Sequence, residues 1–317
     1  MSIGTIIKNN LMKSPKKKIR IGKPYDGGYV ICSDLKYDCV LGCGISNDVS
    51  FEHELIHQLE SVPCYLFDGT IEKLPCNRPE FTFIKKNIGA LETPFSTNLG
   101  EYMKNYKSIF IKMDIEEGEY DWLEFLSENE NLLDNVSQIV LEIHNLRNKM
   151  GTAKRLINLL NKRFHIIHVH GNNGAGGYAT DALDDSIFFD VFEITFLTKD
   201  CFVKPEPSDE EIPSAIDMRN LFERSELFLY SYPFYERLVT KNNVTYSISP
   251  WNNMYNDKFE FNIVENQENT QKWLVISRFH DWGQNLHLRI ENKNTGVNKI
   301  VQCGQSMNCT KLIELTF

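Results

Sequence analysis

The chain has 317 residues, of which 42% are hydrophobic and 12% aromatic, enough for one large core or for a core plus a smaller domain. Its formal net charge of -9 argues against extensive nucleic-acid binding, because proteins that bind a phosphate backbone usually present net basic surfaces. Every apolar run is shorter than the roughly 20 residues that a membrane helix needs, so no integral membrane segment is predicted and a cytoplasmic location is expected.

From residue 19 to about residue 200, short apolar runs alternate with segments of helical length. This alternation is typical of an α/β fold, in which helices cover both faces of a mainly parallel sheet. Strands are predicted at 38–42, 63–67, 81–85, 108–113, 137–143, 164–169 and 191–198, and helices at 48–60, 97–105, 118–127 and 151–162.

The composition changes after residues 203–213, which contain three prolines and four acidic residues and are expected to form an extended connection. From about Leu227, short aromatic and β-branched runs are separated by Asn, Asp and Gly, a pattern that favours a small antiparallel sheet or sandwich. Two domains are therefore predicted, at residues 1–225 and 226–317. Trp282 is the aromatic residue of the second domain that best suits stacking on a sugar ring.

Residues 40–68 combine a strand, a glycine turn, a helix and a second strand that ends on a carboxylate. The first apolar run enters Gly42-Cys43-Gly44, and the second, Cys64-Tyr65-Leu66-Phe67, stops at Asp68. In nucleoside-binding sheets the backbone approaches the cofactor at such glycines, and the acid accepts hydrogen bonds from the ribose hydroxyls. The sequence therefore indicates an enzyme with a nucleoside cofactor.

The ends of the predicted strands are unusually polar, and open parallel sheets bind their ligands beyond these ends. Asp114, Glu142 and His144 end neighbouring strands, and we expect them to converge on one magnesium or manganese ion. The alternatives are a helix cap or turn for Asp114 and a surface-facing strand end for the other two. His170 begins a polar, glycine-rich segment that is predicted to be a substrate or cofactor loop, with an ordinary connection as the alternative.

Several motifs occur together in a characteristic order. They are Arg20-Ile21-Gly22 with Asp26-Gly27-Gly28-Tyr29-Val30, then LGCGIS at 41–46, FDGT at 67–70, IKMDIEEGEYDWL at 111–123 and LEIH at 141–144. In this combination the chain resembles the FkbM-type methyltransferases, particularly their DGGY-bearing branch. The resemblance covers residues 19–220 and does not extend into the C-terminal region.

The resemblance implies a Rossmann-like class I methyltransferase sheet that binds S-adenosylmethionine. It places Gly42 and Gly44 under the amino-acid end of the cofactor, Asp68 on the ribose, and Asn87 to Gly89 beside the adenine. The other positions that it assigns to cofactor contact are Asp26, Gly28, Tyr29, Ser46 and Asp114. One departure is clear, because the family usually reads Glu-Gly-Gly or Glu-Gly-x where this chain has Glu116-Glu117-Gly118.

The expected activity is O-methylation, with a sugar or glycan hydroxyl as the acceptor that the resemblance implies. The sulfonium carbon is already activated, so the protein must align donor and acceptor and remove the acceptor proton. Asp114 and Glu142 are expected to hold a divalent cation, while His144 either completes its shell or takes the proton, and His170 is a further catalytic candidate.

Two alternatives to this function remain open. The first is a non-sugar acceptor, namely a small metabolite, a protein or an RNA ribose, although the acidic balance disfavours RNA. The second is a non-catalytic scaffold that keeps the cofactor-binding fold. The C-terminal β domain is expected to bind the acceptor or to support a homo-oligomer.

Overall fold

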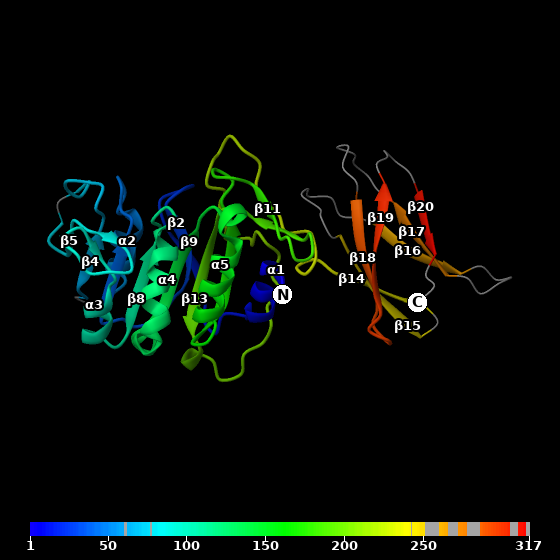
Figure 1. The fold of residues 1–317 in the computed structure, drawn as a ribbon, viewed down its shortest axis with the longest axis horizontal. Coiled ribbons are helices and arrows are strands. Elements are labelled where there is room, and N and C mark those ends of the chain that lie inside the picture. The colour runs from blue at the N-terminus through cyan, green and yellow to red at the C-terminus, as the bar shows by residue number, and fades with distance from the viewer. Residues whose placement is uncertain are drawn as a thin grey trace. The chain divides into compact units, whose positions relative to one another are not determined.

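The computed structural model describes residues 1–59, 62–76, 78–241, 243–250, 260–265, 272–277, 286–304 and 310–314 (Figure 1). The chain divides into an α/β unit, made of Ile6–Ala179 and Phe189–Leu227, and a β unit, made of Met1–Thr5, Thr180–Phe188 and Phe228–Phe317. The β unit thus takes in residues 1–5 and 180–188, which the sequence analysis assigned to the first domain. No helix among the described residues is long and apolar enough to cross a membrane.

The α/β unit is built on a mixed seven-stranded sheet that is mostly parallel. Across the sheet the strands are β5 (Phe81–Ile84), β4 (Cys64–Phe67), β3 (Cys39–Cys43), β8 (Ile109–Met113), β9 (Val136–Ile143), β13 (Phe192–Thr198) and β10 (Phe164–Gly171). β13 runs antiparallel to both of its neighbours. All seven predicted strands are present, and their α/β arrangement is confirmed.

Buried apolar runs form the middle of this sheet. Every residue of β3 and of β8 is buried, as expected for strands that are covered on both faces. The helices of the unit are α2 (Ser50–His57), α3 (Gly100–Asn105), α4 (Gly118–Glu128) and α5 (Leu146–Leu160), together with the 3-10 helices Glu130–Asn135 and Lys199–Cys201. In α5, Ala153, Leu156, Ile157 and Leu160 recur at helical spacing and are buried.

Different elements cover the two faces of the sheet. α4 and α5 lie over one face, and α2 lies over the other together with a hairpin of β1 (Lys18–Gly22) and β2 (Gly28–Cys32) (Figure 1). On the hairpin side, the ring of Tyr29 packs edge-on against Phe51 at 5.5 Å, and Phe51 lies 5.9 Å from Phe110 of β8. The DGGY motif therefore occupies the turn of the hairpin and the start of β2.

The order of the strands creates a crossover in the middle of the sheet. The chain lays down β3, β4 and β5 in one direction and then returns to place β8 on the other side of β3. The connections that follow β3 and β8 consequently leave in opposite directions. Such a topological switch point is where open α/β sheets bind their ligands.

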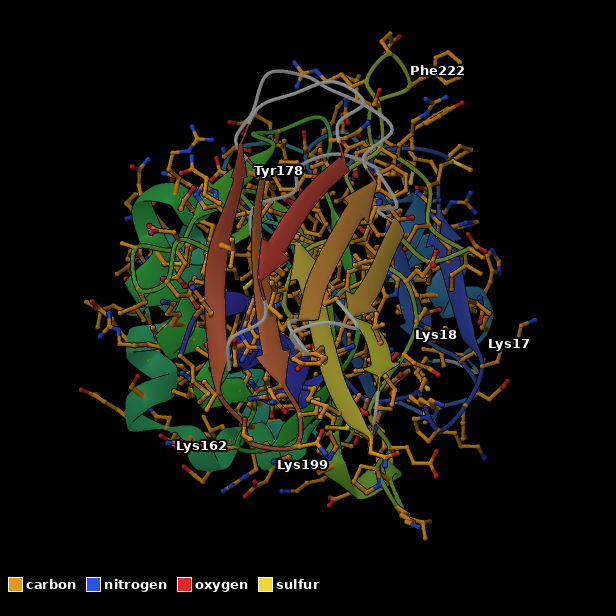
Figure 2. The ribbon with its side chains drawn as sticks, turned by 90° about the vertical axis from the view of Figure 1, so that its right-hand side faces the viewer. Lys17, Lys18, Lys162, Tyr178, Lys199 and Phe222 are labelled. Atoms are coloured by element: carbon orange, nitrogen blue, oxygen red, sulfur yellow. The ribbon has the colours of Figure 1, made fainter. Side chains whose placement is uncertain are left out.

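The β unit contains two antiparallel sheets. One has the order β14 (Arg237–Lys241), β15 (Val244–Pro250), β18 (Leu286–Asn292) and β19 (Asn298–Gly304), and the other β16 (Glu260–Glu265), β17 (Lys272–Ser277) and β20 (Thr310–Glu314). Figure 2 looks onto these strands. The predicted C-terminal antiparallel β structure is thus confirmed. Trp282 lies outside the described residues.

The remaining elements are short. They are α1 (Ile3–Asn10), the parallel pair β6 (Asn87–Ile88) and β7 (Ser96–Thr97), and the pair β11 (Tyr178–Thr180) and β12 (Ile187–Phe189). The β6 segment follows the edge strand β5 and brings Asn87 to the carboxyl end of the sheet.

Candidate functional site

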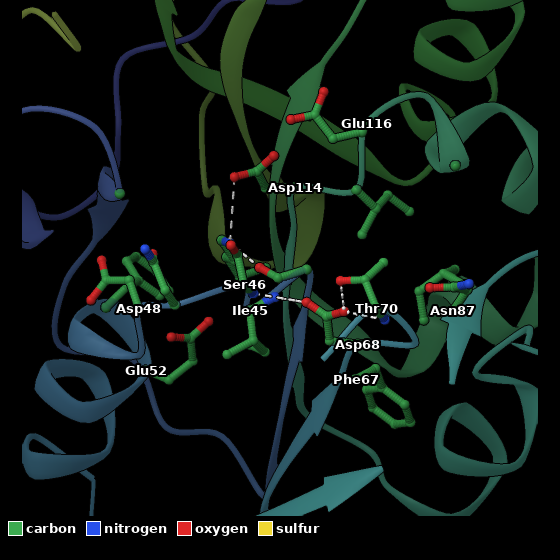
Figure 3. A pocket seen from close by; sticks show the side chains of 18 of the residues that line it. Ile45, Ser46, Asp48, Glu52, Phe67, Asp68, Thr70, Asn87, Asp114 and Glu116 are labelled. Atoms are coloured by element: carbon green, nitrogen blue, oxygen red, sulfur yellow. Dashed lines mark hydrogen bonds and ion pairs between the residues drawn. The ribbon is translucent and has the colours of Figure 1, made fainter. Parts of the chain in front are cut away.

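A cavity of about 750 Å³ opens at the carboxyl ends of β3, β4 and β8, within the size range of small-molecule sites (Figure 3). A second cavity of about 300 Å³ shares part of its wall, because Asp26, Asp114 and Glu116 line both. Glu142, His144, Asn172 and Asn220 also line the second cavity. The switch point thus carries two connected spaces, the smaller of which is rich in carboxylate and amide groups.

Gly44 forms a tight turn in the wall of the larger cavity. Its φ is +79°, and a Cβ atom built at this position would lie 1.6 Å from the carbonyl oxygen of Asp114. The backbone N–H of Gly44 donates to Phe67 O at 2.9 Å, and that of Asp114 donates to Cys43 O at 3.0 Å. Only glycine allows this contact, which holds the ends of β3, β4 and β8 together.

Asp68, predicted to bind a ribose, holds two loops of the cavity wall in place. Its Oδ2 accepts hydrogen bonds from the N–H groups of Ile45 at 3.0 Å and Ser46 at 2.7 Å, and its Oδ1 accepts from the N–H and Oγ1 of Thr70 at 2.7 and 2.6 Å (Figure 3). Burial raises the pKa of Asp68, but these bonds outweigh burial and lower it. Four donors occupy about four lone-pair sites, so contact between Asp68 and a ribose stays a prediction.

Part of the wall of the larger cavity suits an aromatic base. Phe67 and Ile88 provide apolar surface, and Asn87 lines the same wall. The Oδ1 of Asn87 accepts a hydrogen bond from the N–H of Gly69 at 3.1 Å, which leaves its amide donors for other partners. Ser46, also predicted to contact the cofactor, lines the cavity with a φ of +48°.

An acidic cluster lies between the two cavities. Asp114, Glu116 and His144 each place one possible ligand atom within 4.8 Å of the others. The Nε2 of His144 lies 3.6 Å from Asp114 Oδ1 and 3.6 Å from Glu116 Oε2. Two carboxylates and an imidazole form a donor set that magnesium or manganese accepts, so the residues present fit the predicted cation.

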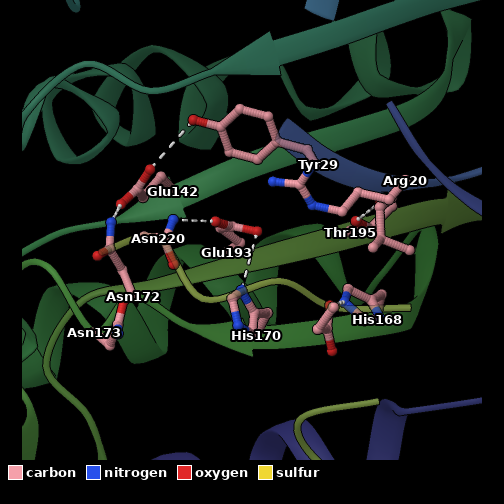
Figure 4. A network of polar contacts seen from close by, with 12 residues as sticks. Arg20, Tyr29, Glu142, His168, His170, Asn172, Asn173, Glu193, Thr195 and Asn220 are labelled. Carbon is pink, nitrogen blue, oxygen red and sulfur yellow. Dashed lines mark hydrogen bonds and ion pairs between the residues drawn. The ribbon is translucent and has the colours of Figure 1, made fainter. Parts of the chain in front are cut away.

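Glu142, the third predicted ligand, lines the smaller cavity beside this cluster, but Glu116 takes its place as the third member. Its Oε1 is 3.9 Å from His144 Nε2 and accepts a hydrogen bond from Asn172 Nδ2 at 2.6 Å (Figure 4). The hydroxyl of Tyr29 donates to Asp114 Oδ2 at 2.8 Å and also lies 3.3 Å from Glu142 Oε2. Burial, followed by the charges of Asp114 and Glu193, raises the pKa of Glu142 to about 8. Tyr29 therefore links the two predicted carboxylate ligands.

His144 is oriented by a carboxylate that the sequence analysis did not single out. Glu119 of α4 is fully buried, and its Oε1 accepts the backbone N–H of His144 at 2.9 Å and lies 3.5 Å from His144 Nδ1. Burial lowers the pKa of His144, but the nearby Glu119, Glu142 and Asp114 outweigh burial and raise the pKa to about 9. With Nδ1 beside Glu119, the Nε2 atom faces the acidic cluster.

Lys112 is a second functional residue that the sequence analysis missed. It belongs to the buried strand β8, and its Nζ donates to the carbonyl of Gly44 at 3.0 Å and lies 3.8 Å from Asp114 Oδ2. Burial lowers the pKa of Lys112, but the charges of Asp114 and Glu52 outweigh burial and raise it. The signal in the sequence was a lysine inside an otherwise apolar run.

Four predicted site residues line neither of these cavities, namely Gly28, Gly42, Gly89 and His170. A Cβ atom at Gly28 would lie 2.3 Å from the Arg20 guanidinium, and one at Gly42 would meet side chains of β4 and α2. His170 is buried, with Nδ1 3.4 Å from Glu193 and Nε2 3.4 Å from Glu226. Burial lowers the pKa of His170, but these neighbouring acids outweigh it and raise the pKa well above its usual value. The structure therefore places His170 in a polar network behind the smaller cavity (Figure 4).

The loop after β8 adopts an unusual backbone at the position where the chain departs from the FkbM-type pattern. Glu116 and Glu117 have φ values of +51° and +79°. Glutamate rarely adopts this left-handed conformation, which glycine adopts readily, and strain of this kind is concentrated at functional sites. In this conformation the Glu116 side chain lies beside His144, and the Glu117 side chain accepts a hydrogen bond from Asn145 Nδ2 at 2.8 Å.

No protein-family model matches the chain, and no curated protein matches it.

Proposed function

We propose that this chain is an S-adenosylmethionine-dependent O-methyltransferase of the FkbM type, which acts on a sugar or glycan hydroxyl with the help of a divalent cation. One observation carries the proposal. A cavity large enough for a nucleoside cofactor adjoins a smaller acidic cavity at the switch point of the sheet, and Asp114 lines both.

The sheet supports a nucleoside cofactor in the larger cavity. Strands β5, β4, β3, β8 and β9 follow the 3-2-1-4-5 order of dinucleotide-binding sheets. The glycine turn at Gly44 brings the backbone close to the cavity, and Phe67 with Ile88 adds apolar lining for a base. These features suit a ligand that has both a polar part and an aromatic part.

The smaller cavity suits a neutral acceptor with several hydroxyls. Carboxylates accept hydrogen bonds from hydroxyl groups, and the amides of Asn172 and Asn220 carry both donors and acceptors. The carboxylates of Asp26, Asp114 and Glu116 line the same space, which disfavours an acceptor that carries a phosphate or carboxylate. A sugar hydroxyl meets these demands better than an RNA ribose does.

The chain's own residues supply the proton chemistry and the alignment. Asp114, Glu116 and His144 hold the cation, which lowers the pKa of the acceptor hydroxyl when it is bound. Glu119 and Tyr29 fix the directions of His144 and Asp114. In the alternative to ligation, the neutral form of His144 takes the acceptor proton at Nε2, and the two roles exclude each other at that atom.

The test is transfer of a labelled methyl group from S-adenosylmethionine to a panel of neutral glycans, acidic glycans, proteins and RNA, with and without EDTA. We expect label in neutral glycans and its loss in EDTA. Label in RNA or protein alone refutes the sugar acceptor, and label that persists in EDTA refutes the role of the cation. Cofactor binding without any labelled product supports the scaffold alternative.

A further inference from the structure

The carboxylate of Glu52 faces the larger cavity with one oxygen unpartnered. Glu52 lies on α2, is 2% exposed and lines the cavity, and its Oε1 has no hydrogen-bond partner among the described residues (Figure 3). An unpaired polar atom costs about 1–3 kcal/mol when it is buried, and more when it is charged. A buried, unpartnered carboxylate oxygen on a residue that lines a ligand cavity points to a donor on the ligand.

The sequence makes room for this carboxylate at Gly42. A Cβ atom at Gly42 would lie 3.0 Å from both Cγ and Oε1 of Glu52, and 2.8 Å from Leu66 Cδ2. Any other residue at this position would press against the Glu52 side chain. Gly42, which the resemblance placed under the cofactor, thus acts by admitting Glu52 to the cavity floor.

A cationic donor suits the unpartnered oxygen of Glu52. The nearby ammonium of Lys112 donates to the carbonyl of Gly44 and lies 3.8 Å from Asp114 Oδ2. Burial raises the pKa of Glu52, and Lys112 only partly offsets that effect. An ammonium group on the ligand would donate a hydrogen bond to Oε1 and would also neutralise the buried charge of Glu52.

We infer that Glu52 binds the α-ammonium group at the amino-acid end of the methyl donor, an inference that rests on the proposed function. The methyl donor has two cationic centres, its sulfonium and its ammonium, and only the ammonium carries N–H donors. Glu52 lies beside Gly42 and on the same cavity as the Gly44 turn, where the amino-acid end is expected. Glu52 thus distinguishes ligands with an amino-acid end from simpler adenosine thioethers.

The test compares two ligands on the full chain by calorimetry. S-adenosylhomocysteine carries the amino-acid end, and 5′-methylthioadenosine lacks it. In Glu52→Gln, we expect the dissociation constant of S-adenosylhomocysteine to rise about tenfold to a hundredfold, because one charge-assisted hydrogen bond is lost. The constant for 5′-methylthioadenosine should stay within about twofold, which is under 0.5 kcal/mol. The control Glu128→Gln, at an exposed position of α4, should change neither constant.

The outcomes separate this inference from the proposed function. If the wild-type chain binds both ligands and Glu52→Gln weakens neither, or weakens both equally, the ammonium assignment is wrong while the cofactor site stands. If the wild-type chain binds neither ligand, the proposed function and the inference both fall. Should Glu52→Gln not fold, the wild-type chain is titrated with the S-adenosylhomocysteine analogue that lacks the amino group. Equal affinity for that analogue overturns the inference, and a tenfold weaker affinity supports it.

Discussion

Replacing Gly44 with alanine should disrupt the junction of β3 and β8. An alanine Cβ would lie 1.6 Å from Asp114 O, so the two loops must separate by roughly 2 Å to reach an ordinary contact. The left-handed conformation costs alanine about 1–2 kcal/mol, and the hydrogen bond from Asp114 N–H to Cys43 O contributes about 1 kcal/mol more. With the steric overlap added, we expect a loss of at least about 3 kcal/mol.

Thermal unfolding of the full chain measures this effect. A loss of about 3 kcal/mol in a unit of this size lowers its Tm by about 6 °C or more. The matched control is Gly151→Ala, since Gly151 lies in α5 with no atom within 4 Å of the added Cβ, and alanine favours the helix. If Gly44→Ala melts within 1 °C of the wild type, the close approach of the two loops is refuted.

Three further predictions concern the acidic cluster and the network behind it. Glu119→Gln should lower the pKa of His144 from about 9 towards its ordinary value, because a negative neighbour is lost; an unchanged NMR titration contradicts the orienting role. Glu116→Gln should weaken manganese binding about tenfold by electron paramagnetic resonance, and unchanged affinity removes Glu116 from the site. Because the pKa of His170 is raised in the folded chain, its protonation stabilises the fold fully below about pH 6.5, and this stability is lost as pH rises through the folded pKa. Between pH 6.5 and 8.5 the free energy of unfolding of the wild type should therefore fall more steeply than that of His170→Gln. The difference in slope should be up to about 1.4 kcal/mol per pH unit. Parallel pH profiles of the two proteins contradict this role.

The positions of the strands could be predicted because a buried parallel strand is a mostly apolar run. β8, Ile109–Met113, is such a run apart from Lys112, and it begins within one residue of its predicted start. The start of α5 was harder to predict from the sequence. The helix begins at Leu146, directly after Asn145, which has a left-handed backbone conformation and provides no side-chain cap. The insertion of β13 between β9 and β10 depends on long-range pairing that periodicity does not encode.

The site was predictable where its residues end strands. Asp114 and His144 were found in this way, and they lie together in the acidic cluster. Three residues of the site were not predicted because they lie inside a strand or a helix, whereas the prediction considered only the residues that end strands. They are Lys112, Glu119 and Glu52. The sequence did offer a signal, namely a charged residue on the apolar face of a helix. Glu119 of α4 is an example, because it lies three and four residues before the buried Trp122 and Leu123.

A crystal structure of the full chain with S-adenosylhomocysteine and manganese would show whether the two cavities hold the methyl donor and the cation. We expect cofactor density from the Gly44 turn to Asn87, with an ion about 2.1 Å from a carboxylate oxygen of Asp114 on the side of the smaller cavity. An empty cavity at saturating ligand, or a cofactor bound away from the ends of β3 and β8, would contradict this expectation.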